Sequence, residues 1–323
     1  MSRKLLILDL NGTLLLRSKH NRSGGGPGRR LRTVYSRPFL PSFRKYIFHP
    51  LTMAWLDTMV WSSAQPHSVK DMVDHCFDSE QQKFLAIWAR DTFGLSAAQY
   101  NKKIQTTKDL VKPWAAFPAH SARTTLLLDD SARKAHRHPY NHVCVRDYVE
   151  ELWDHDRMVM VVQNAKTKAT KLGENEASEP ATLASPKKAS KPKSKSKADA
   201  KKAADAPPPP PAWVLSSERH DETLLAVIGI LDALKPQPDV NDWIRRGGLQ
   251  PSPPSESEST SASELASQMA GLSVSASGTP DSHQAQVLWF DSETIMGHWV
   301  ARGLRALEAL QIEVDAGVSS SRS

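Results

Sequence analysis

Two apolar stretches of the sequence end in carboxylates. Residues 5–8 are Leu-Leu-Ile-Leu and lead into Asp9, and residues 124–128 are Thr-Thr-Leu-Leu-Leu and lead into Asp129 and Asp130. Short apolar runs of this kind are typical of buried strands in a parallel sheet, whose carboxyl ends open onto a ligand crevice. Oxygen ligands that converge from different strand ends suit a hard cation. These residues therefore predict a metal and phosphate site at one edge of a sheet.

Other polar residues also follow apolar runs. Residues 58–61 lead into Ser62 and Ser63, and the apolar residues 84–89 lead into Arg90. A strand that ends in hydroxyls and feeds a helix can place hydroxyl and backbone N–H groups around an oxyanion. Serines also end strands for ordinary capping reasons, so this pattern alone does not require a site. Likewise, the simplest alternative for Asp9 is that it only ends a buried strand.

Five short motifs occur in a fixed order along the chain. They are Asp9-x-Asn11-Gly12-Thr13, Ser62-Ser63, Lys108-Asp109-Leu110, Asp129-Asp130-Ser131 and His138-Pro139-x-Asn141. This order resembles the motifs of the haloacid dehalogenase (HAD) superfamily, in the branch of carboxy-terminal-domain phosphatases that share the FCP1 homology domain. That branch includes small phosphatases of the RNA polymerase II tail, Dullard-type phosphatases and the TIM50-like receptor subunit of the mitochondrial presequence translocase.

The resemblance covers residues 1–155 and 213–248 and implies one phosphatase-like domain built from two segments. The implied fold is α/β, a Rossmann-like three-layer HAD fold with a central parallel sheet, interrupted by a disordered basic insertion. Gly12 would let the chain turn directly after the first strand without a Cβ penalty.

The resemblance also implies a chemistry for the matching residues. Asp9 would attack phosphorus and form a phosphoaspartate. Mg²⁺ would be held by Asp9, the backbone carbonyl of Asn11 and Asp130, with Asp129 in support. The cation is needed because two anions must approach each other. Lys108 would neutralise charge and orient Asp9.

The remaining site residues are assigned to the substrate and to the turn. Ser62 would hydrogen-bond a phosphate oxygen, and Thr13 would stabilise the turn after the first strand. The candidate substrate-binding residues are Thr13, Ser62, Ser63 and Arg90.

Asn11 departs from the family pattern, which has a second aspartate at this position. A carboxylic acid there protonates the leaving oxygen and then activates water, and an amide has no proton to donate in the relevant pH range. We therefore expect a Mg²⁺-dependent hydrolase, a protein phosphatase of phosphoserine and phosphothreonine with weakened activity. The alternative is a catalytically silent, phosphatase-like binding or scaffold protein related to the translocase receptor subunit. A phosphatase of small metabolites is a third possibility.

The rest of the chain has a different composition. Its 323 residues include 22 prolines, and several tracts are too poor in apolar residues to fold. We expect a disordered Lys/Ala/Pro-rich insertion over residues 156–212, a Ser/Pro-rich linker over 249–284 and a tail over 315–323. Residues 17–32 are rich in Arg, Lys and Gly and are expected to form a basic flap with no packed element.

Residues 285–314 carry an apolar stripe at helical spacing and are expected to form an amphipathic helical segment. Such a helix needs a surface to cover its stripe. It can dock onto its own domain, which is the simpler interpretation, or bind another protein.

Composition restricts partners and location. The formal charge of +7 is concentrated in the lysine-rich insertion, so nucleic-acid contact is expected only there. Two cysteines indicate no disulfide framework, and no apolar run reaches the length of a membrane span. Because no presequence is apparent, we expect a cytoplasmic or nuclear protein rather than a mitochondrial one. His136, His138 and His142 lack ligand spacing, so a histidine metal site is not predicted.

Overall fold

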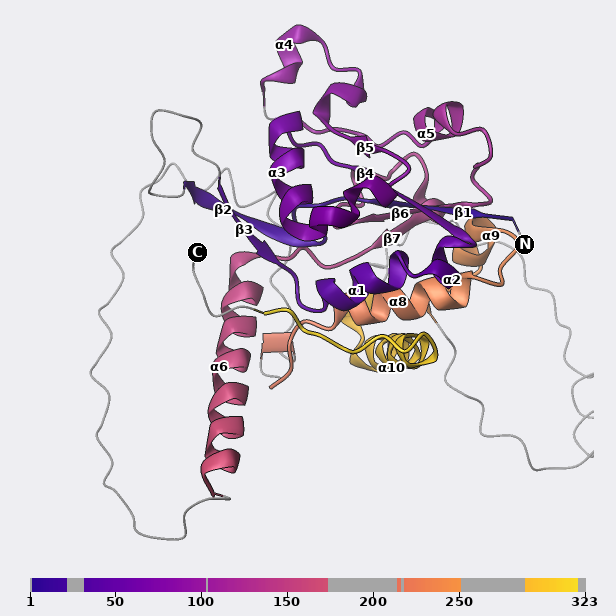
Figure 1. Cartoon of the computed structure of the whole chain (residues 1–323). Coiled ribbons are helices and arrows are strands. Elements are labelled where there is room, and N and C mark those ends of the chain that lie inside the picture. The colour runs from indigo at the N-terminus through magenta and orange to yellow at the C-terminus, as the bar shows by residue number, and fades with distance from the viewer. Residues whose placement is uncertain are drawn as a thin grey trace, which may run out of the picture.

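The computed structural model describes residues 2–21, 32–102, 104–173, 214–215, 218–250 and 288–318. Within these residues a central sheet of five parallel strands has the order β5-β4-β1-β6-β7 (Figure 1). The strands are β1 (Lys4–Leu8), β4 (Leu56–Trp61), β5 (Ile87–Trp88), β6 (Thr125–Asp129) and β7 (His142–Cys144). The predicted α/β fold with a central parallel sheet is confirmed.

Strand β1 is the centre of this sheet and is buried along its whole length. Leu8 pairs with Val60 of β4 on one side and with Leu128 of β6 on the other. Because the three strands are parallel and in this register, the residues that follow them meet at one edge of the sheet. Asp9 and Asp129 are therefore neighbours.

Helices cover both faces of the sheet. Leu6 and Leu8 of β1 belong to a core with α1 (Leu40–Ile47), α3 (Pro66–Phe77) and α8 (Thr223–Leu234). Their alternate neighbours in β1 belong to a second core, against which part of α5 (Val111–Ala116) packs. This alternation is the normal consequence of strand geometry. In Figure 1, α1 and α8 lie below the sheet and α5 lies above it.

The carboxy-terminal helix α10 (Glu293–Ala309) packs on α8, in which every residue except Asp232 is buried. The two helices approach closely at glycines: a Cβ on Gly303 would lie 1.9 Å from the carbonyl oxygen of Leu225. The predicted helical segment therefore docks on its own domain. Its continuation also packs, because Phe39 N–H donates to the Ala316 carbonyl at 2.9 Å. The predicted tail therefore does not begin at residue 315.

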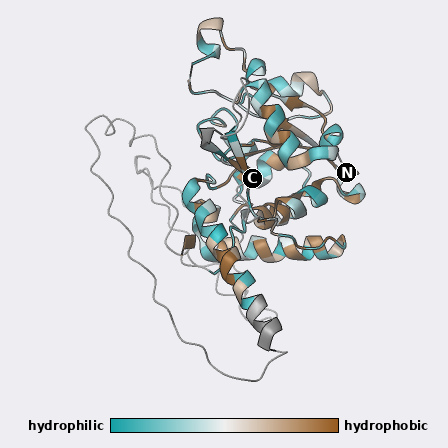
Figure 2. Cartoon of the chain, turned by 60° about the vertical axis from the view of Figure 1, so that its left-hand side comes forward, coloured by the Kyte–Doolittle hydropathy of each residue, from teal (hydrophilic) through white to brown (hydrophobic). Residues whose placement is uncertain are grey.

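Two predicted boundaries are corrected by the structure. Part of the basic flap forms β2 (Leu15–Asn21), which pairs antiparallel with β3 (Arg32–Ser36); residues 22–31 lie outside the described part of the chain. The domain boundary at residue 155 falls inside α6 (Glu150–Gly173), which leads away from the sheet in Figure 1. Figure 2 shows a hydrophobic stretch within this helix.

The helix α6 continues because its first turns have buried partners. Trp153 stacks on Tyr35 of β3 with ring centroids 4.0 Å apart, and Met160 is buried further along. Of the predicted disordered insertion over residues 156–212, residues 174–212 lie outside the described residues, as does most of the predicted linker 249–284.

The remaining elements are short. They are α2 (Pro50–Met53), α4 (Ala97–Tyr100), α9 (Val240–Arg245) and 3₁₀ helices over Asp78–Lys83, Arg90–Phe93, Pro139–Asn141 and Trp289–Asp291. No helix in the described part of the chain has both the length and the apolar character that a membrane span requires.

Candidate active site

Three carboxylates meet at the carboxyl edge of the sheet. Asp9 directly follows β1 and Asp129 ends the adjacent strand β6, and both side chains are buried. With Asp130 they offer oxygen atoms that all lie within 4.8 Å of one another. The sequence prediction that these aspartates come together is confirmed by this geometry.

Lys108 lies against two of these aspartates. Its Nζ is 3.0 Å from Asp9 Oδ1 and 2.6 Å from Asp129 Oδ2, and its side chain is completely buried. The Lys108 N–H donates to the carbonyl of Lys134 at 2.8 Å, which fixes the backbone of this segment beside the loop after β6. The structure thus places Lys108 where it can orient Asp9.

A second lysine, which the sequence analysis missed, completes the cluster. Lys134 Nζ lies 2.9 Å from Asp9 Oδ2, 3.1 Å from Asp129 Oδ1 and 3.5 Å from Asp130 Oδ1. Its spacing of four residues from Asp130 was the one available signal. That signal was weak, because lysines are common in polar turns and their direction depends on the loop.

Burial and neighbouring charges shift the pKa values of Asp129, Asp130 and Lys134. Burial disfavours the charged forms, but the ammonium groups of Lys108 and Lys134 hold the pKa of Asp129 below its ordinary value. Burial raises the pKa of Asp130 to about 8, repulsion from Asp129 adds to this rise and Lys134 opposes it. Burial works against the charged form of Lys134, yet the surrounding carboxylates raise its pKa well above the ordinary value. Lys134 is therefore a cation in this site.

The turn after Asp9 is packed against the same carboxylates. Gly12 has φ +91°, and a Cβ on it would lie 2.6 Å from Asp147 Oδ1 and 2.9 Å from Asp130 Cγ. Only glycine fits this position without strain. Burial raises the pKa of Asp147, a carboxyl group that the sequence analysis also missed.

Thr13 has a structural role in this turn. Its hydroxyl donates to Asp130 Oδ1 at 3.2 Å and accepts from Asp130 N–H at 3.0 Å, and the residue is completely buried. The expected stabilisation of the turn is therefore present. The assignment of Thr13 to substrate binding is corrected, because the hydroxyl has no free direction toward a ligand.

Asn11 uses its side chain at the base of the hairpin. The Arg17 N–H donates to Asn11 Oδ1 at 2.7 Å, and Asn11 itself is exposed at the rim of the site. The amide thus ties the turn to β2. The predicted role of the Asn11 carbonyl as a cation ligand stays a prediction.

Ser62 and Ser63 follow β4, which neighbours β1. Ser62 is buried, and its Oγ accepts weakly from Ala64 N–H at 3.4 Å. Its predicted contact with a phosphate oxygen stays a prediction, as does the role of Ser63. Arg90 is different: its guanidinium donates to the carbonyls of Ser63, Tyr100, Gln99 and Lys102. The assignment of Arg90 to substrate binding is corrected, because the backbone carbonyls of Ser63 and of the loop over residues 99–102 accept hydrogen bonds from its guanidinium.

Arg37 holds the active-site turn from behind. Its Nη1 donates to the carbonyls of Thr13 and Arg146, both at 2.9 Å, and its Nη2 lies 2.8 Å from Asp221 Oδ2. Arg37 is completely buried, and Asp221 precedes α8. The turn is thus anchored to a segment that follows the predicted insertion.

The donor set fits a hard divalent cation. Carboxylate oxygens from two adjacent strand ends lie close enough to share one ion, and such ligands are those that Mg²⁺ prefers. The three histidines of residues 136–142 contact different groups instead: the Arg133 carbonyl, the Asp109 carboxylate and the Asp129 carbonyl.

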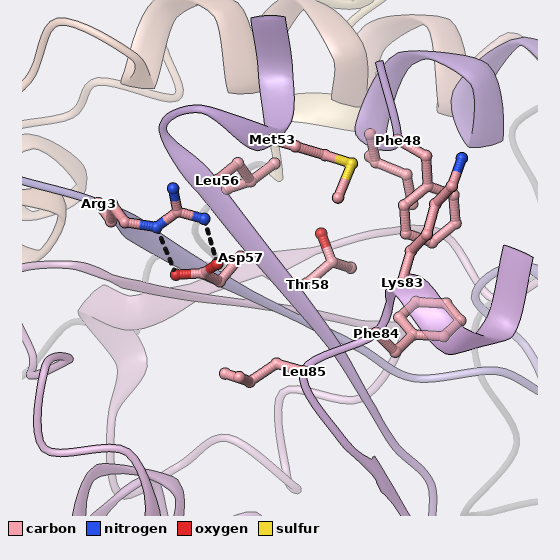
Figure 3. A pocket seen from close by; sticks show the side chains of 10 residues that line it. Arg3, Phe48, Met53, Leu56, Asp57, Thr58, Lys83, Phe84 and Leu85 are labelled. Atoms are coloured by element: carbon pink, nitrogen blue, oxygen red, sulfur yellow. Dashed lines mark hydrogen bonds and ion pairs between the residues drawn. The ribbon is translucent and has the colours of Figure 1, made fainter. Parts of the chain in front are cut away.

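A cavity of about 120 Å³ lies near the start of β4, at the end of the strand opposite to Ser62 (Figure 3). Asp57 and Thr58, near the start of this strand, line it together with Phe48, Lys83 and Phe84. Because Ser62 follows the opposite end of β4, this cavity is separate from the carboxylates.

Comparison with known proteins identifies the family to which the chain belongs. Residues 4–172 match the family model described as NLI interacting factor-like phosphatase, which is more than half of the chain. The chain belongs to this family. The HAD-type resemblance that the motifs suggested is thereby confirmed.

One curated protein with an FCP1 homology domain is similar in sequence to this chain. An uncharacterised FCP1 homology domain-containing protein of Schizosaccharomyces pombe is 40% identical over 157 residues, which is 46% of this chain and 62% of that protein. The match thus spans less than two thirds of the relative's length.

Two solved structures of Fcp1 were also found. The fission yeast RNA polymerase II CTD phosphatase Fcp1 bound to beryllium fluoride shares 15% identity, with 47% of this chain and 43% of that chain covered and a TM-score of 0.31. Fcp1, described as an essential RNA polymerase II CTD phosphatase, shares 14% identity, with 55% of each chain covered and a TM-score of 0.32.

Proposed function

We propose that this protein is a Mg²⁺-dependent phosphatase that works through a phosphoaspartate on Asp9. The observation that supports this most directly is the burial of Asp9 at the end of β1 with Lys108 Nζ 3.0 Å from Oδ1 and the carboxylates of Asp129 and Asp130 alongside. A buried carboxylate next to a fixed ammonium is suited to nucleophilic attack, because its orientation is set before the substrate arrives.

The residues have distinct tasks in this proposal. An Asp9 oxygen forms a bond to phosphorus while the ester oxygen of the substrate leaves, and water later releases phosphate from Asp9. Lys108 fixes the Asp9 carboxylate and reduces its negative charge. Asp9 and Asp130, supported by Asp129, would hold Mg²⁺, which when bound neutralises the approaching phosphate. Ser62, at the neighbouring strand end, is available to hydrogen-bond a phosphate oxygen.

The proposed substrate class is phosphoserine and phosphothreonine in proteins. The family membership and the relative with an FCP1 homology domain support this class. Asn11 weakens the proposed activity, because its amide cannot protonate a serine alkoxide as that group leaves.

A catalytically silent binding protein is the second candidate. Asn11 is the observation that favours it, since its side chain accepts a hydrogen bond from the β2 backbone and offers no acid. In this second case the carboxylate cluster would bind a phosphorylated ligand without turnover.

The two candidates differ in phosphate release. Purified full-length protein should release phosphate from an aryl phosphate in the presence of Mg²⁺ and not in the presence of a chelator. Asp9→Asn should fall to background, because an amide cannot act as the nucleophile. Asp154→Asn is the matched control, since that carboxylate is on α6 with 61% of its side chain exposed. Equal inactivity of wild type and Asp9→Asn, with both folded, would favour the binding protein.

A further inference from the structure

The side chain of Lys134 fills the space between the three carboxylates. We propose that Lys134 occupies the position of the divalent cation, so that the cation binds only when this side chain withdraws. The inference rests on the proposed use of these carboxylates for a cation, but it does not depend on turnover. Lys134 would thus be a built-in competitor for the metal site.

The geometry of the two lysines supports this inference. Lys108 lies on Asp9 Oδ1 and Asp129 Oδ2, whereas Lys134 lies on Asp9 Oδ2 and Asp129 Oδ1. Both carboxylate oxygens of Asp9 and of Asp129 therefore lie within ion-pair distance of a lysine. Lys134 additionally reaches Asp130 Oδ1 at 3.5 Å, which makes it the lysine that contacts all three carboxylates. These are the same atoms from which a hard cation would be coordinated.

The two lysines differ in their freedom to move. Lys108 is completely buried, while 15% of the Lys134 side chain is exposed. The backbone of Lys134 is held at both ends: its N–H donates to the Ser131 carbonyl at 3.0 Å and its carbonyl accepts from Lys108 at 2.8 Å. A flexible four-carbon side chain can therefore leave toward solvent without moving the loop.

Electrostatics requires an exchange rather than joint occupancy. An ammonium and a divalent cation within contact distance of the same three carboxylates would repel each other strongly in a poorly solvated site. When all three carboxylates are ionised and Lys134 is in place, three negative charges face two positive charges. If a divalent cation replaces the ammonium, the charges of Asp9, Asp129, Asp130 and Lys108 are balanced. The cost of releasing Lys134 is then subtracted from the affinity for the cation.

The test measures Mg²⁺ binding to the full chain without substrate. Isothermal titration should give Lys134→Met a Kd at least about tenfold below that of wild type, a change of about 1.4 kcal/mol. Mg²⁺ should also raise the melting temperature of this variant more than that of wild type. Lys70→Met, which removes an exposed lysine from α3, is the matched control and should bind like wild type.

A second measurement reports the withdrawal directly. Reductive methylation of Lys134, followed by mass spectrometry, should be slow in the wild-type protein without a cation and faster with saturating Mg²⁺. Lys134→Gln provides a second variant if Lys134→Met does not fold.

The outcomes separate two failures. Equal Kd values for wild type and the folded Lys134 variants, or weaker binding by those variants, would overturn the inference while leaving the cation assignment intact. Absence of Mg²⁺ binding in wild type and in every folded Lys134 variant would overturn the cation assignment in the proposed function, and this inference with it.

Discussion

Two buried charge clusters lie on either side of the active-site turn, and they are built differently. In the first, Asp9, Asp129 and Asp130 face the ammonium groups of Lys108 and Lys134. In the second, one guanidinium, that of Arg37, faces Asp221 and donates also to the Thr223 hydroxyl and two carbonyls.

The difference indicates that the aspartate cluster is suited to binding a ligand, whereas the Arg37–Asp221 cluster stabilises the fold. Arg37 has a partner for each of its donor groups, and the Asp221 carboxylate also accepts from Thr223 N–H at 2.8 Å, so this cluster has no place for a ligand. In the aspartate cluster, Lys134 contacts all three carboxylates while 15% of its side chain is exposed to solvent. Buried charge is expensive unless it is paired, and a carboxylate cluster whose paired cation reaches solvent is suited to binding a ligand.

The largest effect on turnover should follow from placing a carboxylic acid at residue 11, next to the aspartate cluster. In Asn11→Asp, the new carboxylate can still accept the Arg17 N–H, so the hairpin should be retained. Turnover of a phosphoserine peptide should rise by about 10² to 10⁴, because general acid-base catalysis contributes this much for a poor leaving group. Formation of phosphoaspartate from an aryl phosphate should change far less. Steady-state and burst kinetics measure the two steps.

If wild type and Asn11→Asp hydrolyse phosphoserine peptides equally fast, some other group supplies the proton. Asn11 would then not limit the rate of hydrolysis.

Breaking the second cluster should instead reduce stability. Asp221→Asn leaves the Arg37 guanidinium buried without its carboxylate, which should lower the free energy of unfolding by about 3–5 kcal/mol in a urea titration. Asp232→Asn is the control, since its pair with Arg302 is about one-third exposed and should contribute under about 1 kcal/mol.

The same substitution should change the pH dependence of stability. Burial opposes ionisation of Asp221, but Arg37 outweighs it and lowers the pKa of this carboxyl. A group with a lowered folded-state pKa stabilises the protein above its unfolded-state value of about 3.9, and this contribution is lost as the pH falls below it. Wild type should therefore lose more stability than Asp221→Asn between pH 5 and pH 2. Parallel acid profiles would contradict the assigned pair.

A smaller loss should follow from crowding an uncharged part of the scaffold. Gly303→Ala would place a Cβ 1.9 Å from the Leu225 carbonyl oxygen, so α8 and α10 must separate at a cost of about 1–3 kcal/mol. Gly297→Ala in the same helix meets nothing within 4 Å and should stabilise by about 0.5–1 kcal/mol. Thermal melts of the two variants should therefore shift in opposite directions.

The smallest effect should come from a segment that neither cluster uses. Removal of residues 178–206, which are dominated by Lys, Ala, Ser and Pro, should leave the melting temperature nearly unchanged, because the sequence offers little apolar area and loop closure entropy grows slowly with length. A melt lowered by many degrees would show that these residues stabilise the domain.

Site residues could be predicted from the sequence where they directly follow a strand. Asp9, Asp129 and Asp130 follow apolar runs, so their meeting at one sheet edge could be predicted from strand direction. Lys134 could not, because it stands in a turn whose path decides where the side chain points. Arg90 was misassigned for a related reason: its position after a strand was visible, but not the loop carbonyls of residues 99–102 that occupy it.

Element boundaries failed where polar segments gain partners from elsewhere in the chain. Residues 17–21 have the composition of a solvated loop, and their pairing with β3 is visible only in the fold. The predicted boundary at residue 155 falls inside α6 because the packing of this helix depends on Tyr35 in the same hairpin. Pairing and stacking between distant residues are not recorded in local composition.

The Arg37–Asp221 pair joins residues that are 184 positions apart, and the match to the family model ends at residue 172. A fragment cut at that point would keep every motif residue of the site but would lose Asp221 and α8, leaving a guanidinium buried without its carboxylate and α1 without its cover. During synthesis, likewise, the active-site turn cannot reach its final support until the residues around Asp221 have left the ribosome. The unit that folds is therefore longer than the segment that the family model matches.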